Sequence, residues 1–122
     1  MSEICFLLDE NIPLTLQAQL EQTEPQLQIY AIGDGSAPPK GTSDPDILVW
    51  IEMKGCLLVT NNRATMPVHL QAHLVQGHHV PGIVQLPKRF DIGAILADLV
   101  LILGASHPDE FQDQIIYLPL RA

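Results

Sequence analysis

The chain has 122 residues, of which 47% are hydrophobic and 16% are charged. This composition excludes a disordered chain, and the length fits one domain with its own core, so we expect a single domain over residues 1–122. The formal net charge is −8, and only six side chains are Lys or Arg. Such a protein repels a nucleic-acid backbone on average. Binding to RNA would therefore need local basic residues or metal ions that offset the acids.

Apolar runs alternate with helical patterns along the chain. We expect strands at 4–8, 27–32, 56–60, 82–86 and 113–118, and helices at 13–20, between Ser43 and Gly55, at 67–76 and at 92–103. Ser43 and Asp91 are suited to cap the helices that follow them, and Gly55 is suited to end one. Strands separated by helices of about ten residues indicate right-handed βαβ units. The predicted fold class is therefore α/β, with a mainly parallel sheet covered on both faces.

Acidic side chains follow the first predicted strand and open the middle helix. Asp9 and Glu10 come directly after the run Phe6–Leu8, and Asp44 follows Ser43. In open α/β sheets, ligands bind at the carboxyl ends of the strands. If these acids converge with the segment 61–63, they form an oxygen-rich pocket suited to Mg²⁺.

The same residues also have purely structural explanations. Asp9 and Glu10 fit a strand end that meets solvent, and Asp44 fits a first-turn acid that complements the helix dipole. Asn61-Asn62 is a good turn dipeptide. A phosphotransfer receiver domain also places paired acids after its first strand, but it needs a phosphoacceptor Asp at the end of a later strand, and Thr60-Asn61 supplies none.

The cysteines and the chain ends suggest a cellular setting. Cys5 and Cys56 lie within apolar strand patterns, so we expect buried free thiols and a reduced cytoplasmic location. Residues 1–3 form no basic leader, which argues against secretion. The apolar tract 92–103 is shorter than the roughly 20 residues of a membrane span, so we expect no membrane association. Because this tract is apolar nearly all round, we expect its outer face, or the strand near Ile115, to form a homodimer contact.

The histidines indicate a metal site less clearly than the acidic residues do. His69 and His73 lie four residues apart on one predicted helix face, a spacing that can bind zinc. No nearby Glu or third ligand is apparent, so the spacing alone does not predict a zinc site. His78-His79 is interpreted as a polar turn before a strand. The segment 33–42 is rich in Gly and Pro and long for a connection, which makes it a candidate for function or mobility.

Three motifs, in this order and spacing, resemble the short bacterial PIN-like proteins. They are Leu-Leu-Asp-Glu-Asn-Ile-Pro at 7–13, Ser-Asp-Pro-Asp-Ile-Leu at 43–48, and Gly-Cys-Leu-Leu-Val-Thr-Asn-Asn-Arg at 55–63. The resemblance covers about residues 4–66. It implies a three-layer α/β/α sandwich and hydrolysis of RNA phosphodiester bonds with Mg²⁺ or Mn²⁺. Many members are the toxin of a toxin-antitoxin pair, which implies an antitoxin protein as partner.

Carried over by motif, Asp9 and Asp44 are the first two acids of the metal site, with Glu10 beside Asp9 as a further catalytic residue. Asn62 stands where an acid is expected, and Ala64 stands where the next acid would be. An asparagine oxygen can coordinate a hard cation but brings no charge. We therefore expect a weakly bound Mg²⁺ or Mn²⁺ held by Asp9, Asp44 and Asn62.

These losses predict a ribonuclease of reduced or absent activity on single-stranded RNA. Lys40 and Arg63 are the candidate contacts to RNA phosphates. The alternative is a catalytically inactive PIN-like module that binds a partner. Retained acids favour the first interpretation, and the lost acids favour the second.

Overall fold

A computed structural model describes residues 4–61, 64–104 and 109–120 of the chain. Strands and helices alternate throughout these residues, as the sequence predicts. The elements are β1 (Cys5–Leu8), α1 (Leu14–Thr23), β2 (Gln28–Ala31), α2 (Asp44–Lys54), β3 (Cys56–Thr60), α3 (Met66–Val75), β4 (Ile83–Gln85), α4 (Ile92–Leu103) and β5 (Ile115–Tyr117).

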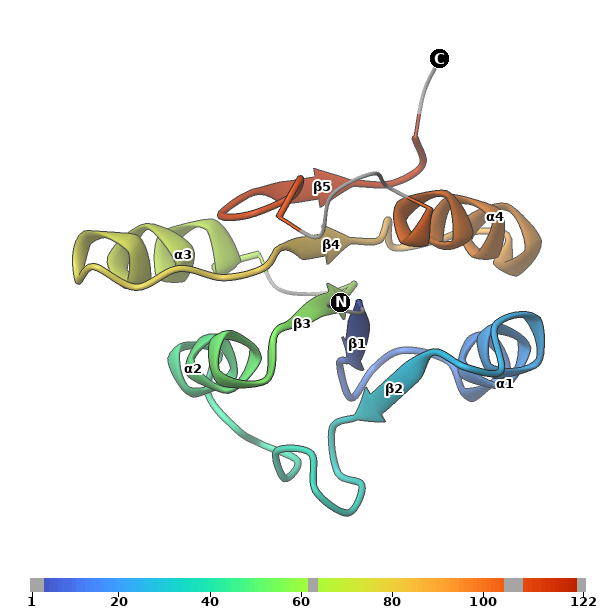
Figure 1. The fold of residues 1–122 in the computed structure, drawn as a ribbon, viewed down its shortest axis with the longest axis horizontal. Coiled ribbons are helices and arrows are strands. Elements are labelled where there is room, and N and C mark those ends of the chain that lie inside the picture. Colours follow the sequence, from blue (N-terminus) through green and yellow to red (C-terminus); the bar gives the residue numbers. More distant parts are fainter. Residues whose placement is uncertain (1–3, 62–63, 105–108, 121–122) are drawn as a thin grey trace.

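The five strands form one sheet in the order β2-β1-β3-β4-β5, and every neighbouring pair is parallel (Figure 1). Leu8 pairs with Val59, so the carboxyl ends of β1 and β3 lie next to each other. From β1 the chain first moves outward to β2 and then returns to β3 on the other side of β1. This reversal is a topological switch point, where open α/β sheets form their ligand crevice.

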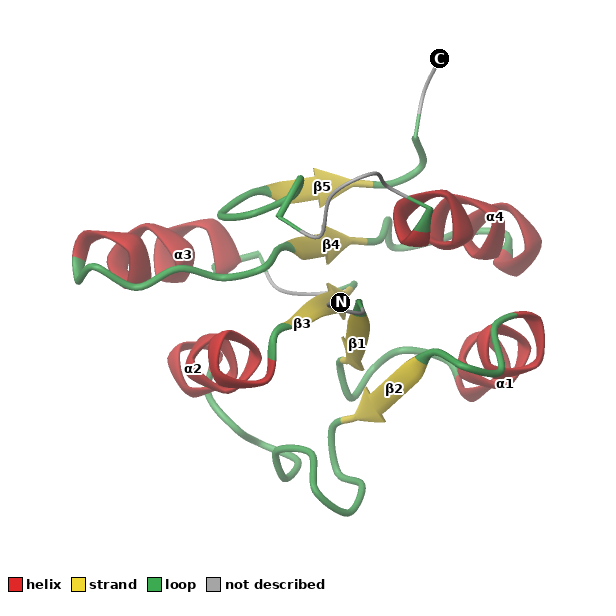
Figure 2. Cartoon of the chain, viewed as in Figure 1, coloured by secondary structure: helices red, strands yellow, loops and turns green. Residues whose placement is uncertain are grey.

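Helices cover both faces of the sheet, which confirms the α/β/α sandwich. Figure 1 shows α1 and α4 on one face and α2 and α3 on the other, and Figure 2 shows the strands as the middle layer. Successive strand residues point to opposite faces. Phe6 and Leu8 accordingly pack with the cluster that includes α1 and α4, whereas Leu7 packs with α2 and α3. The neighbouring strands β1 and β3, which we call the central strands, are both buried along their whole length.

Local signals mark the end of α2 and the start of α4. Gly55 ends α2 with φ 77°, a left-handed conformation that glycine adopts without strain. The Asp91 side chain accepts a hydrogen bond from the backbone N–H of Ala94 at 3.0 Å and so caps α4. Ser43 occupies the predicted N-cap position of α2, but its side chain makes no capping hydrogen bond.

Helix α4 buries one face against the sheet through Ile95, Leu99 and Ile102. On its other side, Leu101 is 65% exposed. The expected homodimer contact through this outer face stays a prediction. Among the described residues, no helix combines the length and the apolar character needed to cross a membrane.

The two cysteines form a disulfide, and the expectation of free thiols is therefore wrong. Cys5 and Cys56 are register partners on β1 and β3, with Cα atoms 4.6 Å apart, and both side chains belong to the core beneath α2 and α3. The sequence indicated two buried cysteines but not their pairing. Pairing depends on strand register between positions separated by 51 residues.

The disulfide should contribute measurably to stability. In guanidinium denaturation, we expect Cys5→Ala/Cys56→Ala to unfold with a free energy about 2–4 kcal/mol lower than that of wild type, because the bond restricts the unfolded chain. Reductant should destabilise the wild type and leave the double variant unchanged. Equal stability of the oxidised wild type and the double variant would contradict this assignment.

Candidate functional site

Asp9 lies at the switch point, directly after β1, and is only 4% exposed. Its backbone N–H donates to the carbonyl oxygen of Val59 at 2.9 Å and so extends the pairing between β1 and β3. Its carboxylate accepts a hydrogen bond from the Thr60 hydroxyl at 2.7 Å and one from the backbone N–H of Glu10 at 2.8 Å. These bonds hold a buried carboxylate in a fixed orientation where the two central strands end.

Asn61 adds a second oxygen at this edge of the sheet. Its side-chain amide nitrogen donates to the carbonyl oxygen of Asn11 at 3.2 Å, which leaves Oδ1 on the other side of the carboxamide. This Oδ1 atom is buried and has no hydrogen-bond partner among the described residues. A buried acceptor without a donor costs free energy and is a recognised sign of a site for an ion or water. From the sequence, Asn61 belonged to the segment 61–63 expected to meet the acids, but Asn62 was the predicted ligand, and no sequence signal marks the unpaired oxygen of Asn61.

Glu10 connects β1 to the long segment 33–42. The Glu10 side chain is exposed, and its Oε1 accepts a hydrogen bond from the backbone N–H of Gly41 at 3.0 Å. The segment also carries internal hydrogen bonds, including Gly33 N–H to the Pro38 carbonyl at 2.8 Å. It is therefore tied together internally and attached to the end of β1.

A pocket of about 260 Å³ opens beside these residues, and its polar walls include Asp9, Glu10, Asp34 and Lys40. Gly33 allows the aliphatic stem of Lys40 to lie close to the backbone, since a Cβ atom on Gly33 would come within 3.0 Å of Lys40 Cγ. The structure thus brings one predicted RNA contact to the pocket that holds two predicted catalytic acids.

Asp44 is the first residue of α2 and is 7% exposed. Its carboxylate faces the start of α3, where it accepts a hydrogen bond from the Thr65 hydroxyl at 3.4 Å and lies 3.8 Å from His69 Nε2. Asp44 is not among the residues that line the pocket. The other predicted ligand, Asn62, and the predicted RNA contact Arg63 lie outside the described residues.

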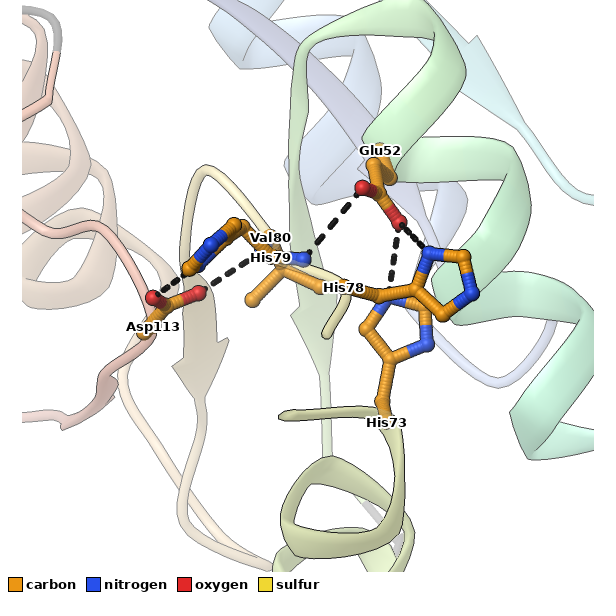
Figure 3. Close-up of polar contacts among 6 residues, drawn as sticks. All are labelled: Glu52, His73, His78, His79, Val80 and Asp113. Atoms are coloured by element: carbon orange, nitrogen blue, oxygen red, sulfur yellow. Dashed lines mark hydrogen bonds and ion pairs between the residues drawn. The ribbon is translucent and has the colours of Figure 1, made fainter. Parts of the chain in front are cut away.

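A second group of polar side chains could hold a metal ion, and none of its members was assigned a metal role from the sequence. Glu52 on α2, His73 on α3 and His78 before β4 place their ligand atoms within 4.8 Å of one another (Figure 3). Glu52 Oε1 lies 2.9 Å from His73 Nε2 and 3.2 Å from His78 Nδ1. His73 is buried, and the two imidazole rings stack with centroids 4.8 Å apart.

The group of Glu52, His73 and His78 corrects the expectation from the sequence that His73 has no Glu or third ligand nearby. His73 contacts Glu52 and His78, whereas His69 faces Asp44. Glu52 precedes His73 by 21 residues and comes from another helix, so only the tertiary packing of α2 against α3 reveals it. The one sequence signal was the density of histidines, because four of the five lie within residues 69–79.

Contacts of Glu52, His79 and Asp113 hold the loop that carries His78. The backbone N–H of His79 donates to Glu52 Oε2 at 3.3 Å. The His79 imidazole lies 2.7 Å from Asp113 Oδ2, and Asp113 Oδ1 accepts from the backbone N–H of Val80 at 2.9 Å (Figure 3). Asp113 therefore attaches the loop to the chain just before β5.

Electrostatics follow from these contacts. The hydrogen bond to Asp113, together with its charge, raises the pKa of His79 above 6.5. Partial burial alone would raise the pKa of Asp113, but the His79 and Val80 hydrogen bonds outweigh it and hold that pKa below 3.8. Desolvation likewise opposes ionisation of Glu52, yet the His79 N–H bond and the nearby His78 and His73 rings keep its pKa below 4.5.

Comparison with family models, with curated proteins and with solved structures found no match to this chain. The functional assignment therefore depends on the geometry of the chain's own residues and on the motif resemblance.

The His79–Asp113 pair should make stability depend on pH. The raised pKa of His79 adds stability that is complete below pH 6.5 and is lost as pH rises through its folded value. The lowered pKa of Asp113 adds stability that is complete above pH 3.8 and is lost as pH falls through its folded value. The pair therefore stabilises most between these limits, where both groups are charged and Glu52 supports the His79 charge.

Urea denaturation with a chelator present tests this. We expect the free-energy difference between wild type and Asp113→Asn to be larger near pH 6 than near pH 9, on the two sides of the His79 titration. A difference that stays constant between the two pH values would refute the pairing in solution.

Proposed function

We propose that this protein is a PIN-like, divalent-metal-dependent ribonuclease with a weakened acidic site that acts on single-stranded RNA. The observation that supports the proposal is the buried Asp9 carboxylate at the switch point, which accepts a hydrogen bond from Thr60. The next residue after Thr60 is Asn61, whose Oδ1 is unpaired within the described part of the chain. Carboxylate and carboxamide oxygens are the ligands that Mg²⁺ and Mn²⁺ prefer.

The residues present fit a hard divalent cation. Asp9 and Asn61 offer oxygens at the carboxyl ends of β1 and β3. The motif resemblance implies Asp44 and Asn62 as the further ligands, and Asp44 would have to turn from Thr65 and His69 to reach an ion beside Asp9. When bound, such an ion activates water as a nucleophile and offsets the charge that develops on the phosphate. Asn62 and Ala64 bring no charge, so the site binds the ion more weakly than an intact acidic cluster would.

Other residues of the pocket have roles that need no direct contact with an ion. The exposed Glu10 carboxylate lies in the pocket wall, where it can accept a proton from the attacking water. Lys40 shares that pocket and supplies positive charge for an RNA phosphate in an otherwise acidic protein. Arg63 is the second proposed phosphate contact.

Specific observations also support the alternative, an inactive PIN-like module that binds a partner. The Asp9 carboxylate already accepts hydrogen bonds from Thr60 and from the Glu10 backbone, and the Glu10 side chain is engaged by Gly41. Ala64 has no ligand atom where the family has an acid. In both versions we propose a homodimer whose partner is a small antitoxin protein. The Cys5–Cys56 disulfide removes the argument from free thiols for a cytoplasmic location.

Restoring the missing charges tests the ribonuclease. With a fluorescent single-stranded RNA and Mn²⁺, we expect Asn62→Asp/Ala64→Asp to cleave at least about tenfold faster than wild type, equivalent to about 1.4 kcal/mol of barrier. Asp9→Asn in the same background should abolish the cleavage. Asp46→Asn is the matched control, because it removes an exposed acid from the same first turn of α2 as Asp44 and should leave the rate unchanged.

The outcomes separate the two candidates. If wild type already cleaves as fast as the restored variant, the weakened-site account is wrong and an asparagine serves in place of an acid. If the restored variant stays inactive although it remains folded, the ribonuclease proposal fails and the binding module is favoured.

A further inference from the structure

We propose that Glu52, His73 and His78 form a separate site for a borderline divalent transition cation, with Zn²⁺ as the best fit. These residues gather at the opposite end of the molecule from Asp9. Glu52 and His78 come shortly before β3 and β4, so the site lies at the amino ends of the strands, whereas Asp9 lies at a carboxyl end. The site therefore does not depend on the proposed ribonuclease function.

The distances between the three ligand atoms are close to the distances between ligands around a bound zinc ion. With metal bonds of about 2.0–2.1 Å, neighbouring ligands of a tetrahedral zinc lie about 3.3 Å apart. Glu52 Oε1 lies 2.9 Å from His73 Nε2 and 3.2 Å from His78 Nδ1. All three atoms lie within 4.8 Å of one another, so the two histidine nitrogens have to approach each other by up to about 1.5 Å. Metal binding replaces the protons that these nitrogens share with the carboxylate.

The surroundings orient the three ligands before an ion arrives. Glu52 Oε2 accepts the His79 backbone N–H, which leaves Oε1 directed at the two histidines (Figure 3). The His78 backbone N–H donates to the His73 carbonyl oxygen at 3.2 Å and holds the loop against the end of α3. Asp113 fixes the same loop from the other side. Such supporting contacts typically decide metal affinity.

The donor set selects the class of ion. Two imidazoles and one carboxylate suit zinc and similar transition cations, whereas Mg²⁺ and Ca²⁺ prefer oxygen ligands alone. His73 is 6% exposed and forms the inner wall, while the His78 side chain is 48% exposed and leaves an entry path. Three protein ligands leave a fourth position for water.

Such an ion would join three segments of the chain. Glu52 belongs to the last turns of α2, His73 to the last turn of α3, and His78 to the loop before β4. Binding therefore stabilises the packing of α2 against α3, because an ion bound only by the folded chain shifts unfolding to higher temperature. Without a metal, the Glu52 carboxylate would simply pair with two imidazoles, and stability would not respond to zinc.

Spectroscopic titration of untagged, chelator-treated and desalted protein tests the proposal. Co²⁺ serves as the probe, because its visible d–d absorption reports a low-coordinate site with nitrogen ligands. We expect one equivalent to bind and Zn²⁺ to displace it. Glu52→Gln and His78→Gln should each weaken binding at least about tenfold. Gln preserves the size of Glu52, and His78 is exposed, so both variants should fold.

His69→Gln is the matched control, since it removes the histidine four residues before His73 and should leave Co²⁺ affinity unchanged. Asp9→Asn should also leave it unchanged, which separates this site from the proposed ribonuclease site. Thermal melting provides a second measurement, with a zinc-dependent rise in Tm that both ligand variants lose. The proposal is overturned if Co²⁺ gives no d–d absorption and zinc does not raise Tm. It is equally overturned if His69→Gln, rather than the two ligand variants, removes binding.

Discussion

Strands β1 and β3 are buried on both faces of the sheet, and this burial decides where polar side chains can lie. Two strands without an exposed face leave no place for polar side chains along their length. Polar groups therefore collect where the strands end, and the parallel register of Leu8 with Val59 places both ends together. The Asp9 carboxylate is buried at this edge, and the Thr60 hydroxyl stabilises it. The candidate site is thus a consequence of strand register.

The same architecture separates two kinds of chemistry. Carboxylate and carboxamide oxygens dominate the carboxyl edge of the sheet, where Asp9, Glu10 and Asn61 lie. Histidines dominate the amino edge, where Glu52 and His78 precede their strands. Helix α2 connects the two edges, since Asp44 begins it and Glu52 lies near its end. A hard cation at one edge and a borderline cation at the other would therefore act on opposite ends of one helix.

Local sequence patterns predicted much of the secondary structure. The bounds of β3 and α4 and the Asp91 cap agree with the sequence prediction, because burial pattern and capping chemistry are properties of neighbouring residues. Contacts between residues far apart in the sequence could not be predicted from such local patterns. The Cys5–Cys56 disulfide depends on register across 51 residues. The meeting of Glu52 with the histidines depends on how two helices pack, and the orientation of the Asn61 carboxamide depends on its contact with Asn11, 50 residues away.

The proposed ribonuclease requires a divalent ion at the switch point, bound through Asp9. Backbone NMR with a small fraction of an equivalent of paramagnetic Mn²⁺ tests it most directly, after the histidine group has been saturated with Zn²⁺. We expect selective broadening of the amide signals of Glu10, Gly41 and Asn61, and loss of this effect in Asp9→Asn. Broadening that is absent from these residues, or unchanged in Asp9→Asn, would contradict binding at Asp9.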